Sequence, residues 1–174
     1  MAEVPDQIRL DRHRDLIGRR GQVWWRHGIT IALLAFLVAG LLNEFGQAQD
    51  IFHAGGGSAS LEISAPAHLR GGLLYTVVFT IAARRDVKNA VLELSPAWGE
   101  GQQINTIEPT PLGQGSRNGD LLFTLGHIPA GQKYVLYMGF QVNPTNVGSR
   151  SADVKLYDGG SLLAHIDRTL TVLP

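Results

Sequence analysis

The segment from Ile29 to Leu42 constrains this chain most, because it holds fourteen residues of which only Thr30 is polar. Gly28 before this segment and residues 43–45 after it extend it to eighteen residues. A helix of that length covers about 27 Å, close to the ~30 Å hydrocarbon core of a lipid bilayer. We therefore predict one membrane-spanning helix at residues 28–45.

The flanks of this segment predict how it crosses the membrane. Trp24, Trp25 and Arg26 precede it and are typical of the membrane interface, where aromatic rings and long cationic side chains sit. Residues 1–28 carry six arginines and four acidic residues, whereas residues 43–69 carry no Lys or Arg. Cations accumulate on the cytoplasmic side. We expect a cytoplasmic tail at residues 1–27 and an extracytoplasmic C-terminal part, in a single-pass protein of the cell membrane.

Two alternatives concern this helix. A cleaved signal peptide also has a basic start, an apolar core and small residues after it, although a leader of 28 residues before the core is long for one. Small residues recur along one face of the predicted helix, at Gly28, Ala32, Ala35 and Ala39. Such a face allows another helix to approach closely, including one from a second copy of the chain, but alanine is also common in any apolar helix.

The remainder of the chain divides by composition into a linker and a domain. Residues 46–58 include three consecutive glycines and predict a flexible linker. Residues 59–174 carry nine cations and nine acids, so the domain is neutral and a nucleic-acid partner is not expected. The absence of cysteine excludes disulfides, thiolate metal sites and a cysteine nucleophile.

Short runs rich in β-branched and aromatic residues, each ended by Gly, Pro, Asn or Asp, predict strands throughout this domain. We expect about eight, in the regions of residues 61–64, 73–83, 90–94, 103–107, 121–125, 134–142, 152–157 and 162–173. No helical pattern separates them, so a parallel α/β sheet is not expected. The predicted fold is all-β: an Ig-like antiparallel β-sandwich at residues 59–174, preceded by one transmembrane helix.

Local motifs add a resemblance. The stretch Leu69–Gly72 before a strand and Pro129–Gln132 before a long strand resemble Ig-like modules of bacterial surface and envelope proteins. Residues 105–109, 140–148 and 167–172 resemble a group of uncharacterised actinobacterial proteins with a single N-terminal span. That resemblance covers most of residues 28–174 and implies an exported Ig-like domain, but no activity.

Catalytic and metal-binding patterns are weak. No His pair has zinc-ligand spacing and no Gly-x-Ser-x-Gly elbow occurs, so we predict no catalytic residue, no metal and no cofactor. His165 and Asp167 are two apart and on a strand share one face, which suits a dyad but also an ordinary solvent-facing row.

One loop suggests a binding surface. Trp98 lies among prolines and glycines, followed by Glu100, in a loop that could present the ring to a partner or fold it back over the sandwich edge. We interpret the chain as a non-enzymatic, membrane-anchored interaction module, an accessory subunit whose partner is another membrane or envelope protein. The alternative is an extracytoplasmic carbohydrate-binding module or hydrolase, with Glu100 and Glu108 near Trp98.

Overall fold

The computed structural model describes residues 20–42 and 48–174, which form two units, a helix and a β-sandwich. Most of the expected cytoplasmic tail, residues 1–19, and residues 43–47 lie outside the described residues.

Helix α1 (Arg20–Leu41) begins well before the predicted span and takes in Trp24 and Trp25. Its most apolar window, Trp24–Leu41, has a mean hydropathy of 1.4, and none of that window is buried inside the structure. The chain therefore carries an N-terminal helix long and apolar enough to cross a membrane.

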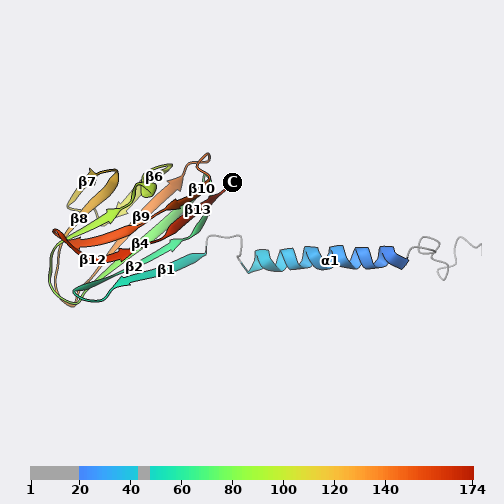
Figure 1. The fold of residues 1–174 in the computed structure, drawn as a ribbon, viewed down its shortest axis with the longest axis horizontal. Coiled ribbons are helices and arrows are strands. Elements are labelled where there is room, and N and C mark those ends of the chain that lie inside the picture. The colour runs from blue at the N-terminus through green and yellow to red at the C-terminus, as the bar shows by residue number, and fades with distance from the viewer. Residues whose placement is uncertain (1–19, 43–47) are drawn as a thin grey trace, which may run out of the picture. The chain divides into compact units, whose positions relative to one another are not determined.

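The sandwich is built from thirteen strands in the described residues (Figure 1). One five-stranded sheet has the order β1-β2-β4-β9-β6, and a second has the order β12-β11-β5-β8-β7. Three further strands form a small sheet of order β10-β13-β3, in which β13 runs parallel to β3. All other pairings are antiparallel. The bounds are β1 (Gln49–Gly55), β2 (Ala59–Pro66), β3 (His68–Arg70), β4 (Leu74–Ala83), β5 (Val87–Leu94), β6 (Gln102–Glu108), β7 (Gly113–Arg117), β8 (Asp120–Ile128), β9 (Lys133–Val142), β10 (Gly148–Ser151), β11 (Val154–Asp158), β12 (Ser161–Ile166) and β13 (Thr169–Leu173).

The antiparallel β-sandwich is thus confirmed, with more strands than predicted. The main correction concerns residues 46–58, because residues 49–55 of that supposed linker form β1, which pairs with β2 along seven positions. The three consecutive glycines led to the linker prediction, but the first of them, Gly55, ends β1, and the other two lie in the connection to β2. Arg84 closes the turn that follows, donating from Nη1 to the Gly56 carbonyl at 2.6 Å.

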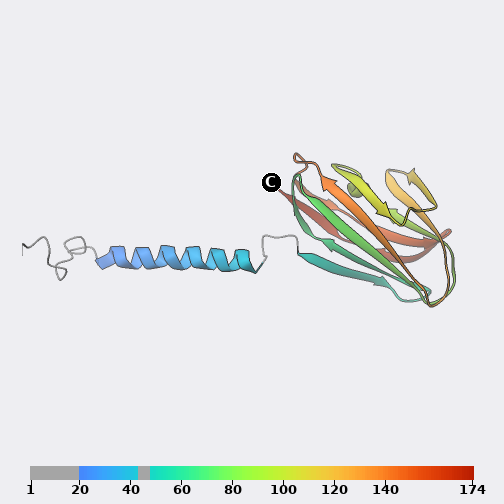
Figure 2. The same ribbon diagram turned by 180° about the vertical axis from the view of Figure 1, so that it is seen from behind.

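Alternating side chains create the core between the two five-stranded sheets, which Figures 1 and 2 show from opposite sides. In β4 every second residue from Tyr75 to Ala83 is buried, and the same period-two pattern places Leu136, Met138 and Phe140 of β9 inside. The opposite sheet contributes Leu92 and Leu156, both fully buried. The side chains at the outward positions of both sheets are therefore the ones that can contact a ligand or partner.

Candidate functional site

The predicted binding residue Trp98 is not on the surface. A short 3-10 helix, η3 (Pro96–Trp98), turns its ring into the core, where it is completely buried. The ring lies 5.8 Å from Phe79 and 5.4 Å from Phe140 between centroids, and Nε1 donates to the Ala152 carbonyl at 3.1 Å. The prediction that Trp98 contacts a partner is therefore wrong; a tryptophan in this position closes the end of a hydrophobic core.

Glu100 and Glu108, the other residues predicted to bind a ligand or partner near Trp98, do not form a site with its ring. Glu100 is exposed, and its backbone carbonyl accepts a hydrogen bond from Arg150 at 3.2 Å. Glu108 is exposed at the other end of β6, opposite Tyr137. A buried ring offers no stacking surface for a sugar, so these residues do not form the carbohydrate site that the alternative required.

The small-residue face of the helix is exposed at three of its four positions. An added Cβ at Gly28 would meet nothing within 4 Å, and Ala32 and Ala35 are exposed. Ala39 is half-buried within its own helix. Trp24 and Trp25 are 82% and 75% exposed, as interfacial anchors would be in the absence of lipid, and Arg26 is also exposed.

Charged side chains gather on the outer face of the sheet β12-β11-β5-β8-β7. The register places His165 of β12 opposite Lys155 of β11, and Lys155 opposite Glu93 of β5. Because residues two apart on a strand share a face, Asp153 and Asp167 join the same surface. This row spans three adjacent strands, which sequence spacing alone could not bring together.

Glu93 is the centre of that surface and is only 3% exposed. Its carboxylate accepts from Arg117 Nη2 at 2.5 Å, from Lys155 Nζ at 3.1 Å and from the Tyr157 hydroxyl at 3.4 Å. Burial raises the pKa of this carboxyl, but the hydrogen bonds from Lys155 and Arg117 outweigh it and hold the pKa below its usual range. The hydrogen bond to Glu93 in turn raises the pKa of Lys155. The cluster is therefore ionised and paired at neutral pH.

A shallow hollow of about 300 Å³ adjoins this cluster. Its polar lining includes Asp120, Asp153, Lys155, Ser95 and Ser151. Since Lys155 is engaged by Glu93, the hollow presents mainly carboxylate and hydroxyl oxygens. Such a lining suits a small cationic or hydroxyl-bearing group better than an anion.

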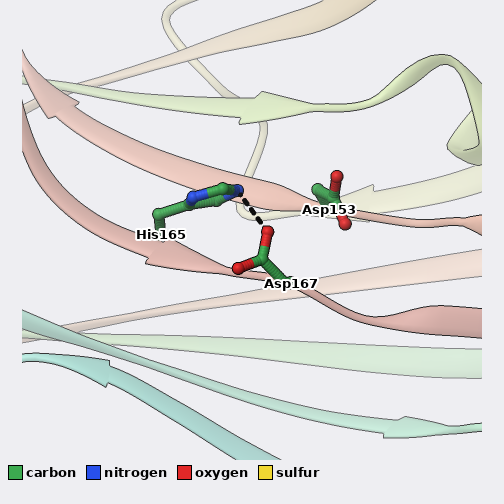
Figure 3. A group of neighbouring side chains, drawn as sticks. All are labelled: Asp153, His165 and Asp167. Carbon is green, nitrogen blue, oxygen red and sulfur yellow. Dashed lines mark ion pairs between the residues drawn. The ribbon is translucent and has the colours of Figure 1, made fainter.

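A second group of ligand-type side chains lies at the edge of the same sheet (Figure 3). His165 Nε2 is 3.0 Å from Asp167 Oδ1, which confirms that the two residues share a face. Asp153, just before β11, completes a group whose ligand atoms all lie within 4.8 Å of one another. Its Oδ1 also accepts from the backbone N–H of Arg168 at 3.3 Å. Imidazole and carboxylate groups so placed could hold a metal ion.

The neighbouring Arg168 points the other way, into the core, and is 5% exposed. Its guanidinium lies 5.0 Å from the Trp98 ring and 5.1 Å from the Phe52 ring, and Nη2 donates to the Pro66 carbonyl at 2.7 Å. Nε and Nη1 have no hydrogen-bond partner in the described structure. Burial lowers the pKa of Arg168, opposed by the nearby Tyr75 and Asp50. Sequence analysis missed this residue, although period two places it in phase with the buried Ile166 and Leu170.

The outer face of the sheet β1-β2-β4-β9-β6 is different, because its central strands carry no charge over most of their length. One row crosses all five strands through Ile51, Ser64, Val78, Tyr137 and Glu108. Ile51 is 60% exposed and Tyr137 is 51% exposed. Neighbouring outward positions are the uncharged Leu74, Thr76, Thr80, Val135, Gly139 and Gln141. We call this surface the neutral face.

Comparisons with known proteins add little. No family model matches the sequence, and no curated protein matches it. Among solved structures the chain is similar to a non-cellulosomal cohesin from the hyperthermophilic archaeon Archaeoglobus fulgidus, with a TM-score of 0.40 and 17% identity over 72% of this chain and 91% of that one.

Proposed function

We propose that this chain is a single-pass, membrane-anchored interaction module, whose sandwich binds a protein partner outside the cytoplasm through the neutral face. The observation that carries the proposal is the helix Trp24–Leu41, none of which is buried inside the structure. Ile31 and Phe36 are 66% and 64% exposed. Leaving such side chains in water costs about 1.5–3 kcal/mol each, so lipid or another apolar surface must cover them.

The short connection between the two units supports a partner close to the membrane. Gln49, the first residue of β1, follows Leu41, the last of α1, by only eight residues. A fully extended chain of eight residues spans at most about 28 Å. This limit on the reach of the connection favours an accessory subunit of a membrane or envelope complex over a far-reaching adhesin.

The composition of the neutral face supports a protein as the partner. The centres of protein interfaces are depleted in charge and enriched in aromatic residues. Tyr137 has this character, since its partner Val78 on β4 is uncharged, and the carboxylate of Glu108 faces it only from the edge strand β6. Charged residues, such as Glu62 and Glu108, lie on the flanking strands. This arrangement of an uncharged centre and a polar rim is typical of interaction surfaces.

The finer parts of the proposal extend the sequence analysis. We assign the chain an Ig-like fold related to the uncharacterised actinobacterial single-pass proteins, no catalytic activity, and a cytoplasmic N-terminus. The carbohydrate-binding or hydrolytic alternative is not favoured by a specific observation, because the ring on which it depended is buried. A reporter fused after Pro174 should be active only outside the cytoplasm, and cytoplasmic activity would reverse the topology.

Site-specific crosslinking in intact membranes tests the partner surface. A photoreactive residue at position 137 should capture one discrete membrane or envelope protein, identified by mass spectrometry. The matched control is Leu162 on β12, which is 54% exposed against 51% for Tyr137 but lies on the other sheet. In a second set of experiments the photoreactive residue replaces Val78, the cross-strand partner of Tyr137. Tyr137→Glu should then reduce capture of the partner at least tenfold, whereas Leu162→Glu should leave it unchanged. Equal capture from positions 137 and 162, or none from either, would contradict the proposal.

A further inference from the structure

Three potential metal ligands lie close together around the β11–β12 hairpin, at one edge of the sheet β12-β11-β5-β8-β7. Figure 3 shows the His165 ring directed at the Asp167 carboxylate, with Asp153 beside them. Two of the ligand atoms, His165 Nε2 and Asp167 Oδ1, are already 3.0 Å apart, and all three residues offer atoms within 4.8 Å of one another. Ligands 2.0–2.2 Å from a tetrahedral zinc ion are roughly 3.3–3.6 Å apart, so only a small side-chain adjustment is needed.

The backbone holds two carboxylates face to face at this position. Val154 pairs with Ile166, so the next step of the antiparallel ladder brings Asp153 opposite Asp167. The Ala152 N–H donates to the Arg168 carbonyl at 2.8 Å, which fixes the two segments together just beyond that pair. Like charges at facing positions destabilise a sheet, and a bound cation would relieve the repulsion.

The nearby cations of the protein are directed elsewhere. Lys155, the cross-strand neighbour of His165, donates to Glu93, which also binds Arg117. The guanidinium of Arg168 lies in the core beside Trp98 and donates to the Pro66 carbonyl. Neither of these two side chains therefore neutralises the facing carboxylates, and the ligand atoms remain accessible, since the side chains of His165 and Asp167 are 35% and 81% exposed.

We propose that Asp153, His165 and Asp167 bind one divalent transition-metal ion of the zinc class. The imidazole favours such an ion over Ca²⁺ or Mg²⁺, which prefer all-oxygen sites. Three protein ligands on an exposed edge leave at least one coordination position for water. This site lies on the sheet opposite the neutral face, so it goes beyond the proposed function and stands or falls separately from it.

Zinc binding to the full chain in detergent micelles, without a histidine tag, tests the proposal by isothermal titration calorimetry with ZnCl₂. We expect one saturable Zn²⁺ per chain. His165→Gln and Asp167→Asn should each weaken binding at least tenfold, and Asp153→Asn should do the same while keeping the oxygen that accepts from the Arg168 N–H. A thermal melt of each variant without zinc verifies that it is folded.

The chain offers a matched control in a second His–Asp pair. His127 Nε2 lies 2.7 Å from Asp86 Oδ1, and both side chains are about half exposed, but the pair is not in a three-ligand group among the described residues. His127→Gln should therefore leave zinc binding unchanged. The proposal is overturned if the wild type shows no saturable binding tighter than about 1 mM. It is equally overturned if His127→Gln weakens binding as much as His165→Gln, or if His165→Gln has no effect.

Discussion

Trp98 offers the most direct test of the packing, because the structure assigns it a structural role instead of a binding one. Replacing Trp98 by Ala removes a fully buried ring that contacts Phe79 and Phe140. Deleting a buried Trp side chain costs about 3–5 kcal/mol, through lost transfer free energy and the cavity left behind. The Ala152 carbonyl also loses its donor, and a buried acceptor without a partner costs about 1–3 kcal/mol unless water enters the cavity.

We therefore expect Trp98→Ala to lower the free energy of unfolding of the sandwich by about 4 kcal/mol or more, against a total of about 5–15 kcal/mol for a typical domain. For a domain of this size, 1 kcal/mol corresponds to roughly 3–5 °C, so the melting temperature should fall by about 12–20 °C. Trp98→Phe keeps an aromatic ring between the same neighbours and should cost about 1–3 kcal/mol.

Differential scanning calorimetry of the full chain in detergent provides the assay, with the unfolding transition attributed to the sandwich. The matched control is Trp25→Ala, which removes the same side chain from a position that is 75% exposed on α1. It should leave the sandwich transition within about 2 °C of the wild type. A loss of less than about 1 kcal/mol for Trp98→Ala, or an equal loss for Trp25→Ala, would refute the inference that Trp98 closes the core.

Two further predictions concern the buried charges. Because the pKa of Glu93 is lowered on folding, its ionised form stabilises the fold above the usual Glu pKa of about 4.3, and this contribution is lost as the pH falls through the lower folded value. Glu93→Gln should therefore cost about 1–2 kcal/mol at pH 7, measured by calorimetry, and this difference from the wild type should narrow as the pH falls below about 4.3. The exposed Glu108→Gln should cost less than about 0.5 kcal/mol at pH 7. A difference for Glu93→Gln that does not change with pH would contradict the assignment. Arg168→Met should keep or raise the melting temperature, because it removes a buried cation with two unpartnered nitrogens while filling a similar volume. Arg168→Ala should lower the melting temperature by several degrees. Equal losses in the two variants would show that the charge itself is stabilising.

The fold class could be predicted because strand signals are local, and so could the shared face of His165 and Asp167, which needs only a period of two. The charged cluster could not, since Glu93 and Lys155 are 62 residues apart and meet only through the strand order β11-β5. Asp153 lies just before β11 and meets His165 through the register of the local β11–β12 hairpin. Strand order depends on which hydrophobic faces pack best across the whole domain, and no local pattern carries that information.

Trp98 and Arg168 show a different limit of prediction from sequence. The local sequence does not decide whether either side chain points inward or outward, and in the folded chain the two side chains pack against each other. A loop rich in Gly and Pro can turn a tryptophan outward or inward, and a cation in the inward phase of a strand is ordinarily unfavourable. In the folded chain the Trp98 ring provides one face against which the Arg168 guanidinium lies, and Phe52 of the unpredicted strand β1 provides another. The burial of the cation thus depends on the tryptophan, and the position of Phe52 depends on the segment expected to be a linker. Sequence reasoning that treats loop, linker and strand separately cannot reach this arrangement, because its stability exists only when all three are packed together.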